Sequence, residues 1–362
     1  MADTDIGCLD ICIPRHFRQR FSLPMNSIHD VSNILAIRLS GIGDVILMMP
    51  ALAALKCAFP DSRLTLMTGS QCVSIAELCP YIDRVVPVDR KALKTKPKLK
   101  AVGEIYHLIR ELRAEDFDLV VDFHSLRETN LMARLSGARY RVGLKRSQRA
   151  YLSFCFNLEP AVQDEALHMA ATFRALAQNI VGVLPDTGAG LPLIEVGPAA
   201  KAVAARFEGP GPRVALNVGA SRAPRRWSAA RFSQVASYAV DRLGASVLVI
   251  GGVADEEASL AREVQAGSKN PDRVHLANGL SFPELAALIG SVDLLVSNDT
   301  GPMHIGPALG IPTIGIFAGG SPHHYRPAGP LDQCVQGKSM EDIEVESVIA
   351  AMDRIWHQLE PV

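Results

Sequence analysis

The sequence has few aromatic residues, almost no excess charge of either sign and no long hydrophobic run. Aromatics make up 6% of its 362 residues, and 37 lysines and arginines against 38 aspartates and glutamates give a formal net charge of -1. Such a chain lacks the general basic field of proteins that coat nucleic acid. Its longest apolar runs are strand-sized, shorter than the roughly 20 residues of a membrane-spanning helix. The first ten residues are acidic and no signal-peptide core follows them, so we expect a cytoplasmic protein.

Cysteines are few and poorly spaced for cross-linking. The seven are odd in number, lie far apart and form no C-x-x-C pair, which argues against a disulfide framework and a zinc ribbon. Cys72 and Cys79 would need a further ligand to bind a metal, and no ligand pair lies near them in the sequence. We therefore expect no metal site and interpret most cysteines as small buried hydrophobic residues.

What the sequence does have is a repeated alternation of short apolar runs and helical patterns, typical of parallel α/β sheets. The predicted strands are 34–38, 63–68, 84–88, 119–123, 213–218, 246–250, 294–297 and 313–317. The main predicted helices are 44–59, 229–243, 255–265, 282–289, 302–309 and 345–359. A length of 362 residues with 48% hydrophobic content suits two globular domains.

A stretch rich in proline and glycine divides this pattern into two similar halves. We predict an N-terminal extension (1–30), a Rossmann-like domain (31–185), a linker with one short helical stretch (186–212), a second Rossmann-like domain (213–340) and a C-terminal helix (341–362). Two doubly wound α/β domains facing a central cleft fit best. Ligands of such sheets bind outside the carboxyl ends of the strands, so the loops there are the candidate sites.

The first candidate loop is SGIGDV at 40–45, whose glycines let the backbone approach a ligand. Asp44 opens the next helix, either as a helix-stabilising charge or as a carboxylate directed into the cleft. A dinucleotide-binding fingerprint fits poorly, because Ile46 or Leu47 stands where its third glycine belongs.

Two further loops suit an anion. Residues 217–228 (NVGASRAPRRWS) lead through a glycine turn, a hydroxyl and three arginines to a helix start, which favours a phosphate over a merely solvated loop. We expect Trp227 to pack on the sheet rather than stack on a base. Residues 297–304 (SNDTGPMH) supply a hydroxyl and a bare backbone at Thr300 and Gly301, with His304 as a protonatable neighbour or a structural histidine. Aspartic proteases need two Asp-Thr-Gly copies in an all-β fold, so that reading is excluded.

In their order and spacing these segments resemble the bacterial ADP-heptose:lipopolysaccharide heptosyltransferases of glycosyltransferase family nine. The similarity runs from about residue 34 to 329. Its most specific parts are RLSGIGDV (38–45) followed by PAL (50–52), NVGA (217–220) with RRW (225–227), and NDTGPMH (298–304) followed by ALGIPT (308–313).

The resemblance implies a GT-B architecture, with the acceptor on the first domain, the nucleotide sugar on the second, and inverting chemistry without a metal or cofactor. Asp44 matches the family's catalytic base. Donor contacts carried over by the match are Ser221, Arg225, Glu256, Asp299, Thr300, Gly301 and His304, and acceptor contacts are Arg38, Gly43 and Arg127. Arg225 stands where the family usually has lysine, and Glu256 has equally acidic neighbours in Asp255 and Glu257.

The resemblance also implies an anionic glycolipid acceptor, met at the inner membrane surface, and no nucleic-acid partner. The lysine-rich stretch 91–100 either contacts this acceptor or is a solvated loop. Two departures from the family leave the substrates open: the N-terminal extension, and AGGS after Phe317 where the family commonly has Gly-Pro-Thr. A different nucleotide sugar, a non-lipopolysaccharide acceptor such as a protein, and a non-catalytic nucleotide-sugar-binding protein remain alternatives.

Overall fold

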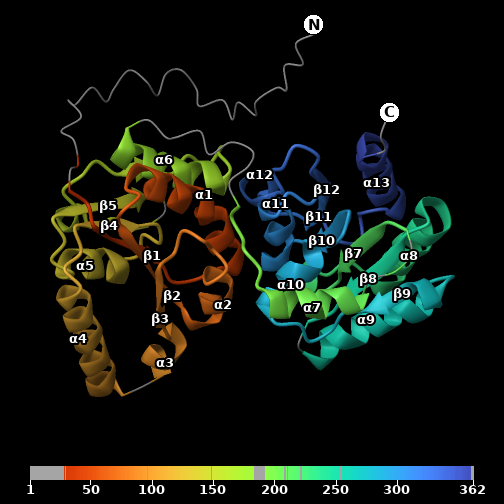
Figure 1. Cartoon of the computed structure of the whole chain (residues 1–362), viewed down its shortest axis with the longest axis horizontal. Helices are drawn as coiled ribbons and strands as arrows, with labels where there is room; N and C mark the ends of the chain where they lie inside the picture. The colour runs from red at the N-terminus through yellow and green to blue at the C-terminus, as the bar shows by residue number, and fades with distance from the viewer. Residues whose placement is uncertain are drawn as a thin grey trace, which may run out of the picture. The chain divides into compact units, whose positions relative to one another are not determined.

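The computed structural model describes residues 28, 30–95, 97–147, 149–182, 192–207, 209, 211–220, 222–252 and 254–359. Nearly all of the expected N-terminal extension lies outside these residues, as do residues 183–191, which include the start of the predicted linker. Contacts divide the chain into two units. The first unit consists of the described residues before Gly41, of Met48–Val73, and of the described residues from Tyr81 to 182. The second unit consists of Gly41–Leu47, Ser74–Pro80 and the described residues from Pro192 onward. Each unit has one six-stranded sheet with helices around it (Figure 1).

The first unit has the strand order β3-β2-β1-β4-β5-β6, and every pairing is parallel. Its strands are β1 Asn33–Arg38, β2 Arg63–Gly69, β3 Arg84–Val88, β4 Leu119–Asp122, β5 Tyr140–Lys145 and β6 Ala161–Val162. Its helices are α3 Arg90–Thr95, α4 Lys98–Ala114, α5 Arg127–Leu135 and α6 Met169–Val181, while α1 Ile42–Ala58 and α2 Val73–Ala76 contribute to both units. The central strands β1 and β4 are almost fully buried, which explains their uninterrupted apolar sequence.

The second unit repeats this plan with the order β12-β11-β10-β7-β8-β9, again all parallel. The strands are β7 Arg213–Asn217, β8 Ser246–Ile250, β9 Val274–Leu276, β10 Leu294–Asn298, β11 Thr313–Ala318 and β12 Gln333–Gly337. The helices are α7 Pro198–Ala204, α8 Ala229–Leu243, α9 Asp255–Gly267, α10 Phe282–Ile289, α11 Ile305–Ala308, α12 Pro322–Tyr325 and α13 Val345–Leu359. In each sheet the strand order reverses beside the first strand, between β1 and β4 and between β7 and β10.

The α/β fold class and all eight predicted strands are confirmed, with ends that differ by one residue at most. Sequence analysis missed β5, β6, β9 and β12, which are edge or near-edge strands: β6 has only two residues, and the other three contain charged or polar residues. The predicted helix at 302–309 is wrong in form: the segment is a 3-10 turn, Gly301–His304, followed by the four-residue α11. Pro302, Gly306 and Pro307 explain this, because proline lacks a donor and glycine disfavours a helix interior. None of the helices in the described ranges is long and apolar enough to cross a membrane.

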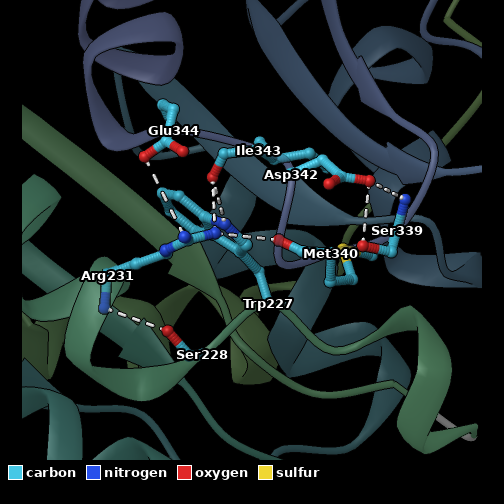
Figure 2. Close-up of polar contacts among 8 residues, drawn as sticks. All are labelled: Trp227, Ser228, Arg231, Ser339, Met340, Asp342, Ile343 and Glu344. Carbon is cyan, nitrogen blue, oxygen red and sulfur yellow. Dashed lines mark hydrogen bonds and ion pairs between the residues drawn. The ribbon is translucent and has the colours of Figure 1, made fainter.

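Trp227 and Arg231 tie the start of α8 to the segment before α13, as Figure 2 shows. Trp227 is 1% exposed, so the expectation that it packs in the core is confirmed, and its indole Nε1 donates to the Ile343 carbonyl at 3.0 Å. Arg231 donates to the carbonyls of Met340 and Ile343 at 2.9 and 2.8 Å. Glu344 approaches the same guanidinium at only 3.9 Å and is mainly exposed. The loop 217–228 is therefore held at its carboxyl end by core contacts.

Arg231→Ala should lower the free energy of unfolding by about 2 kcal/mol, because it removes two charge-assisted hydrogen bonds to partly buried carbonyls. Glu344→Ala is the matched control and should change it by less than about 0.5 kcal/mol, as expected for an exposed ion pair. Urea unfolding followed by tryptophan fluorescence reports on this unit, since Trp227 and Trp356 are the chain's two tryptophans. Equal losses in the two variants would contradict the anchoring role.

Candidate functional site

The candidate loops lie at the carboxyl edges of the two sheets, where the strand order reverses. The loops after β7 and β10 flank the reversal in the second sheet, and those after β1 and β4 flank it in the first. Such switch points form the crevices in which open α/β sheets bind ligands. The expected placement of the loops at the carboxyl ends is thus confirmed for each sheet taken by itself.

Two asparagines connect the loops after β7 and β10 of the second unit through hydrogen bonds. Asn217 Nδ2, at the end of β7, donates to Ser297 Oγ at 2.8 Å and to Thr300 Oγ1 at 3.0 Å. Asn298 Nδ2, at the end of β10, donates to the Val218 carbonyl at 2.9 Å. Its Oδ1 accepts from the Trp227 amide at 3.1 Å. Both asparagines are buried, so they fix the relative position of the two loops.

Arg225 and Asp299 form an ion pair across these loops. Arg225 Nη1 lies 3.0 Å from Asp299 Oδ2, and the two side chains are 46% and 20% exposed. Burial raises the pKa of Asp299, while the charge of Arg225 opposes this shift. Two residues assigned to the donor from sequence therefore contact each other, and the half-exposed guanidinium has further donors for an anion.

Glu256 and Glu257, in the first turn of α9, have different surroundings. Glu256 is 71% exposed and pairs with Arg226. Glu257 instead covers the glycines: a Cβ placed on Gly219 would lie 3.0 Å from its Oε1, and one on Gly252 would collide with its Oε2. Of the three acidic neighbours, Glu257 is the one whose carboxylate lies against both the β7 and β8 loops. Ser221, in the same region, lies outside the described residues.

The first turn of α1 belongs to the second unit and meets the turn after β10. A Cβ on Gly43 would lie 2.6 Å from His304 Cδ2, and one on Gly301 would lie 3.4 Å from the Gly43 nitrogen. Gly41 has φ +86°, and a Cβ there would lie 2.2 Å from Asp44 Oδ2. These glycines thus allow the carboxylate of Asp44 and the imidazole of His304 to approach the backbone closely.

The switch point of the first unit is built on the buried Asp122. Its carboxylate accepts hydrogen bonds from the amides of His124 and Ser125, from Thr129 Oγ1 and from Asn130 Nδ2, all at 2.8 or 2.9 Å. Burial raises its pKa, and the four hydrogen bonds oppose that shift. This network fixes the turn between β4 and α5, whose first residue is the exposed Arg127.

His124 lies in that turn, where the charges of four arginines act on it: Arg38, Arg90, Arg146 and Arg149. It is 3% exposed, and among the described residues neither ring nitrogen has a hydrogen-bond partner. Burial, and then the charges of Arg38, Arg90, Arg146 and Arg149, lower its pKa from 6.5 to about 3. The side chain is therefore a neutral imidazole at physiological pH.

Arg38, the predicted acceptor residue, belongs to the same group. It is 4% exposed and donates to the carbonyls of Ser40 and Phe123 at 3.2 and 3.0 Å. The predictions from sequence missed His124, although its position directly after a buried strand was a usable signal. The group as a whole concentrates positive charge at the carboxyl edge of the first sheet.

The native state should lose stability on acidification because of His124. A histidine with a folded pKa near 3 and an unfolded pKa near 6.5 favours unfolding once pH falls below 6.5, since only the unfolded chain binds the proton. Between pH 7 and pH 5 this contributes a loss of about 2 kcal/mol. His124→Gln should remove that part of the pH dependence in urea unfolding, whereas the exposed His107→Gln should keep it. An unchanged slope in His124→Gln would show that the imidazole is not held neutral.

Comparison with known proteins gives a family match and several similar relatives. The model of glycosyltransferase family 9 (heptosyltransferase) matches residues 105–350. Lipopolysaccharide heptosyltransferase 3 of Escherichia coli is 24% identical over 291 residues, covering 79% of this chain and 83% of the relative. Lipopolysaccharide heptosyltransferase 1 of Pseudomonas aeruginosa is 27% identical over 295 residues, covering 80% and 79%.

Solved structures share the fold. A family 9 glycosyl transferase from Veillonella parvula has a TM-score of 0.76 at 23% identity, covering 91% of this chain and 98% of that one. ADP-heptose lps heptosyltransferase II of E. coli has a TM-score of 0.73 at 19% identity, covering 91% and 100%. The two Rossmann-like sheets are thus those of the GT-B type. Because the family model spans more than half of the chain, the protein belongs to glycosyltransferase family 9 and is a glycosyltransferase.

Proposed function

We propose that this enzyme transfers heptose from ADP-L-glycero-D-manno-heptose to an anionic lipopolysaccharide core acceptor, with inversion at the anomeric carbon and Asp44 as the general base. The family and the names of the relatives support this donor and acceptor, since several relatives are lipopolysaccharide heptosyltransferases. One solved relative, the heptosyltransferase WaaC of E. coli, contains ADP.

The observation that carries the proposal is the position of the first turn of α1. Asp44 is in that turn, which groups with the second unit and lies against Gly301 and His304. A base must reach the attacking hydroxyl beside the sugar's anomeric carbon, so it must lie near the residues that hold the donor phosphates. The contact between Gly43 and His304 supplies this proximity.

Donor binding is assigned to the two loops that Asn217 and Asn298 hold together. Arg225, Thr300 and Gly301 would bind the diphosphate through a guanidinium, a hydroxyl and a backbone amide, with His304 and Asp299 beside them. Asp299 aligns Arg225 through their ion pair. Ser221 keeps its assignment from the sequence as a phosphate-binding hydroxyl.

For the ribose, the structure favours Glu257 over the Glu256 expected from sequence. A ribose acceptor must face the glycine loops, as Glu257 does, whereas Glu256 is turned to solvent and Arg226. The carboxylate would accept hydrogen bonds from the ribose hydroxyls, as acidic residues do in other Rossmann-like sites.

Acceptor binding is assigned to the carboxyl edge of the first sheet and to Gly43. Arg38 and the arginines around His124 supply cations for acidic sugars or phosphates, and the exposed Arg127 extends this group on α5. A glycolipid acceptor would bring the enzyme to the inner membrane surface.

The proposed reaction is a single displacement. Asp44 takes the proton of the acceptor hydroxyl as its oxygen forms a bond to the anomeric carbon, and the bond from that carbon to the diphosphate oxygen breaks. ADP leaves with the electron pair, and Arg225 and the backbone of Gly301 stabilise its charge. The proposal assigns no metal or cofactor to these steps.

The direct assay incubates the full chain with ADP-heptose and a lipid-linked acidic core acceptor and detects the heptosylated product by mass spectrometry. Transfer from ADP-heptose, and not from UDP- or GDP-sugars, supports the proposal. Transfer from another nucleotide sugar would mean that the donor differs from the one proposed, and transfer only to a protein would mean that the acceptor differs. Binding without transfer to any acceptor would make the chain a nucleotide-sugar-binding protein.

Asp44→Asn should reduce turnover by about a hundredfold or more, because the general base is lost, while ADP affinity stays within about threefold. Asp61→Asn, an exposed aspartate just beyond the end of the same helix, is the control and should leave turnover unchanged. Initial rates and calorimetric titration measure the two quantities. Unchanged turnover in Asp44→Asn would reduce Asp44 to a stabilising charge at the start of α1.

Glu257→Gln should weaken ADP binding about tenfold, because a charge-assisted hydrogen bond to the ribose is lost. Glu256→Gln is the matched control one residue away and should change affinity less than twofold. Calorimetric titration of both variants with ADP separates the two assignments. A loss confined to Glu256→Gln would restore the original assignment and reject Glu257.

A further inference from the structure

Helix α4 exposes an apolar surface that the core does not use. Val102 and Tyr106 are 64% and 63% exposed and Ile105 is 36% exposed, and their spacing of three and four residues puts them on one face. The contacts with the core come from Leu108 and Leu112, further along the helix. The N-terminal half of α4 thus has an apolar face beyond the one that packs on the sheet.

Basic residues are frequent in the sequence before and after this face. The segment from Arg90 to Lys100 contains six lysines and arginines and no acidic residue, although the whole chain has a net charge of -1. On α4 itself Lys100, Arg110 and Arg113 are exposed, and so are the acidic Glu104 and Glu111. Apolar side chains beside a local excess of positive charge are typical of helices that lie in the interface of anionic bilayers.

The topology puts this half of α4 at the functional edge of its unit. The helix lies in the crossover connection between the parallel strands β3 and β4, so it runs antiparallel to them. Its N-terminal half therefore lies toward the carboxyl ends of the strands. Figure 1 shows this half extending from the edge of the first unit. At the same edge Arg90, at the start of α3, pairs with Glu128 at 2.9 Å and acts on His124.

We propose that the face formed by Val102, Ile105 and Tyr106, with the basic residues around it, binds the surface of an anionic lipid bilayer. The choice of a lipid surface over a protein rests on the proposed function, because a glycolipid acceptor is embedded in such a surface. The apolar side chains enter the interfacial region, and the lysines and arginines meet the lipid phosphates. This orientation brings the carboxyl edge of the first sheet toward the headgroups that carry the acceptor.

The test is sedimentation of the full chain with vesicles of phosphatidylcholine alone or with phosphatidylglycerol. The wild type should bind the mixed vesicles, more weakly at high salt, and bind pure phosphatidylcholine poorly. The double variant Val102→Ser/Tyr106→Ser should bind the mixed vesicles at least about tenfold more weakly. Phe154→Ser is the control, because Phe154 is 68% exposed in the same unit but lies outside α4.

Wild-type protein that stays unbound, or a double variant that binds as well as wild type, would overturn the proposal. A wild type that forms a dimer and binds no vesicles, together with a double variant that is a monomer, would also overturn the proposal. The face would then be an interface between copies of the chain. Thermal denaturation of the double variant should match wild type, since both side chains are exposed.

Activity assays separate this proposal from the proposed function. The double variant should transfer sugar normally to a delipidated core oligosaccharide and poorly to the same core in mixed vesicles. Equal loss on both acceptors would mean that the variant damages the active site, which overturns the membrane role. Vesicle binding by a wild type that transfers to no acceptor would leave the membrane face intact and reject the proposed function.

Discussion

Every strand of both sheets runs parallel to its neighbours, and the location of the candidate site depends on this constraint. Parallel strands need helical crossovers, so the loops at their carboxyl ends are collected at one edge of each sheet. Where the strand order reverses, adjacent loops diverge and leave room for a ligand. The two reversals are beside β1 and β7, and the glycine-rich segments of the sequence follow these strands.

Hydrogen bonds from buried polar side chains then fix the conformations of these loops. In the second unit Asn217 and Asn298 join the loops after β7 and β10, and Trp227 anchors the same region to the core. In the first unit Asp122 accepts four hydrogen bonds, two from the turn that contains His124 and two from the start of α5. The network of the second unit holds its loops in place, so the half-exposed Arg225 beside it needs little reorganisation to meet an anion.

Much of the fold could be predicted because buried parallel strands are uninterrupted apolar runs. The missed strands lack that signal: β12 is the edge strand QCVQG, and β6 has only two residues. The turn after β10 was expected to be a helix since its pattern is apolar, but two prolines and a glycine prevent a continuous α-helix. Within the site, the choice between Glu256 and Glu257 could not be made, because adjacent helix residues point about 100° apart and only the loop geometry fixes their directions. His124 was missed because its significance comes from four arginines that lie on three other segments of the chain.

A crystal structure of the chain with ADP would locate the donor site directly. We expect the diphosphate at Arg225, Thr300 and Gly301 and the ribose at Glu257, on the carboxyl edge of the second sheet. The same unit has a cavity of about 580 Å³ lined by Lys201, Arg213 and Ser291, at the amino ends of its strands. ADP bound in that cavity, with the loops after β7 and β10 unoccupied, would contradict the assignment of the donor site.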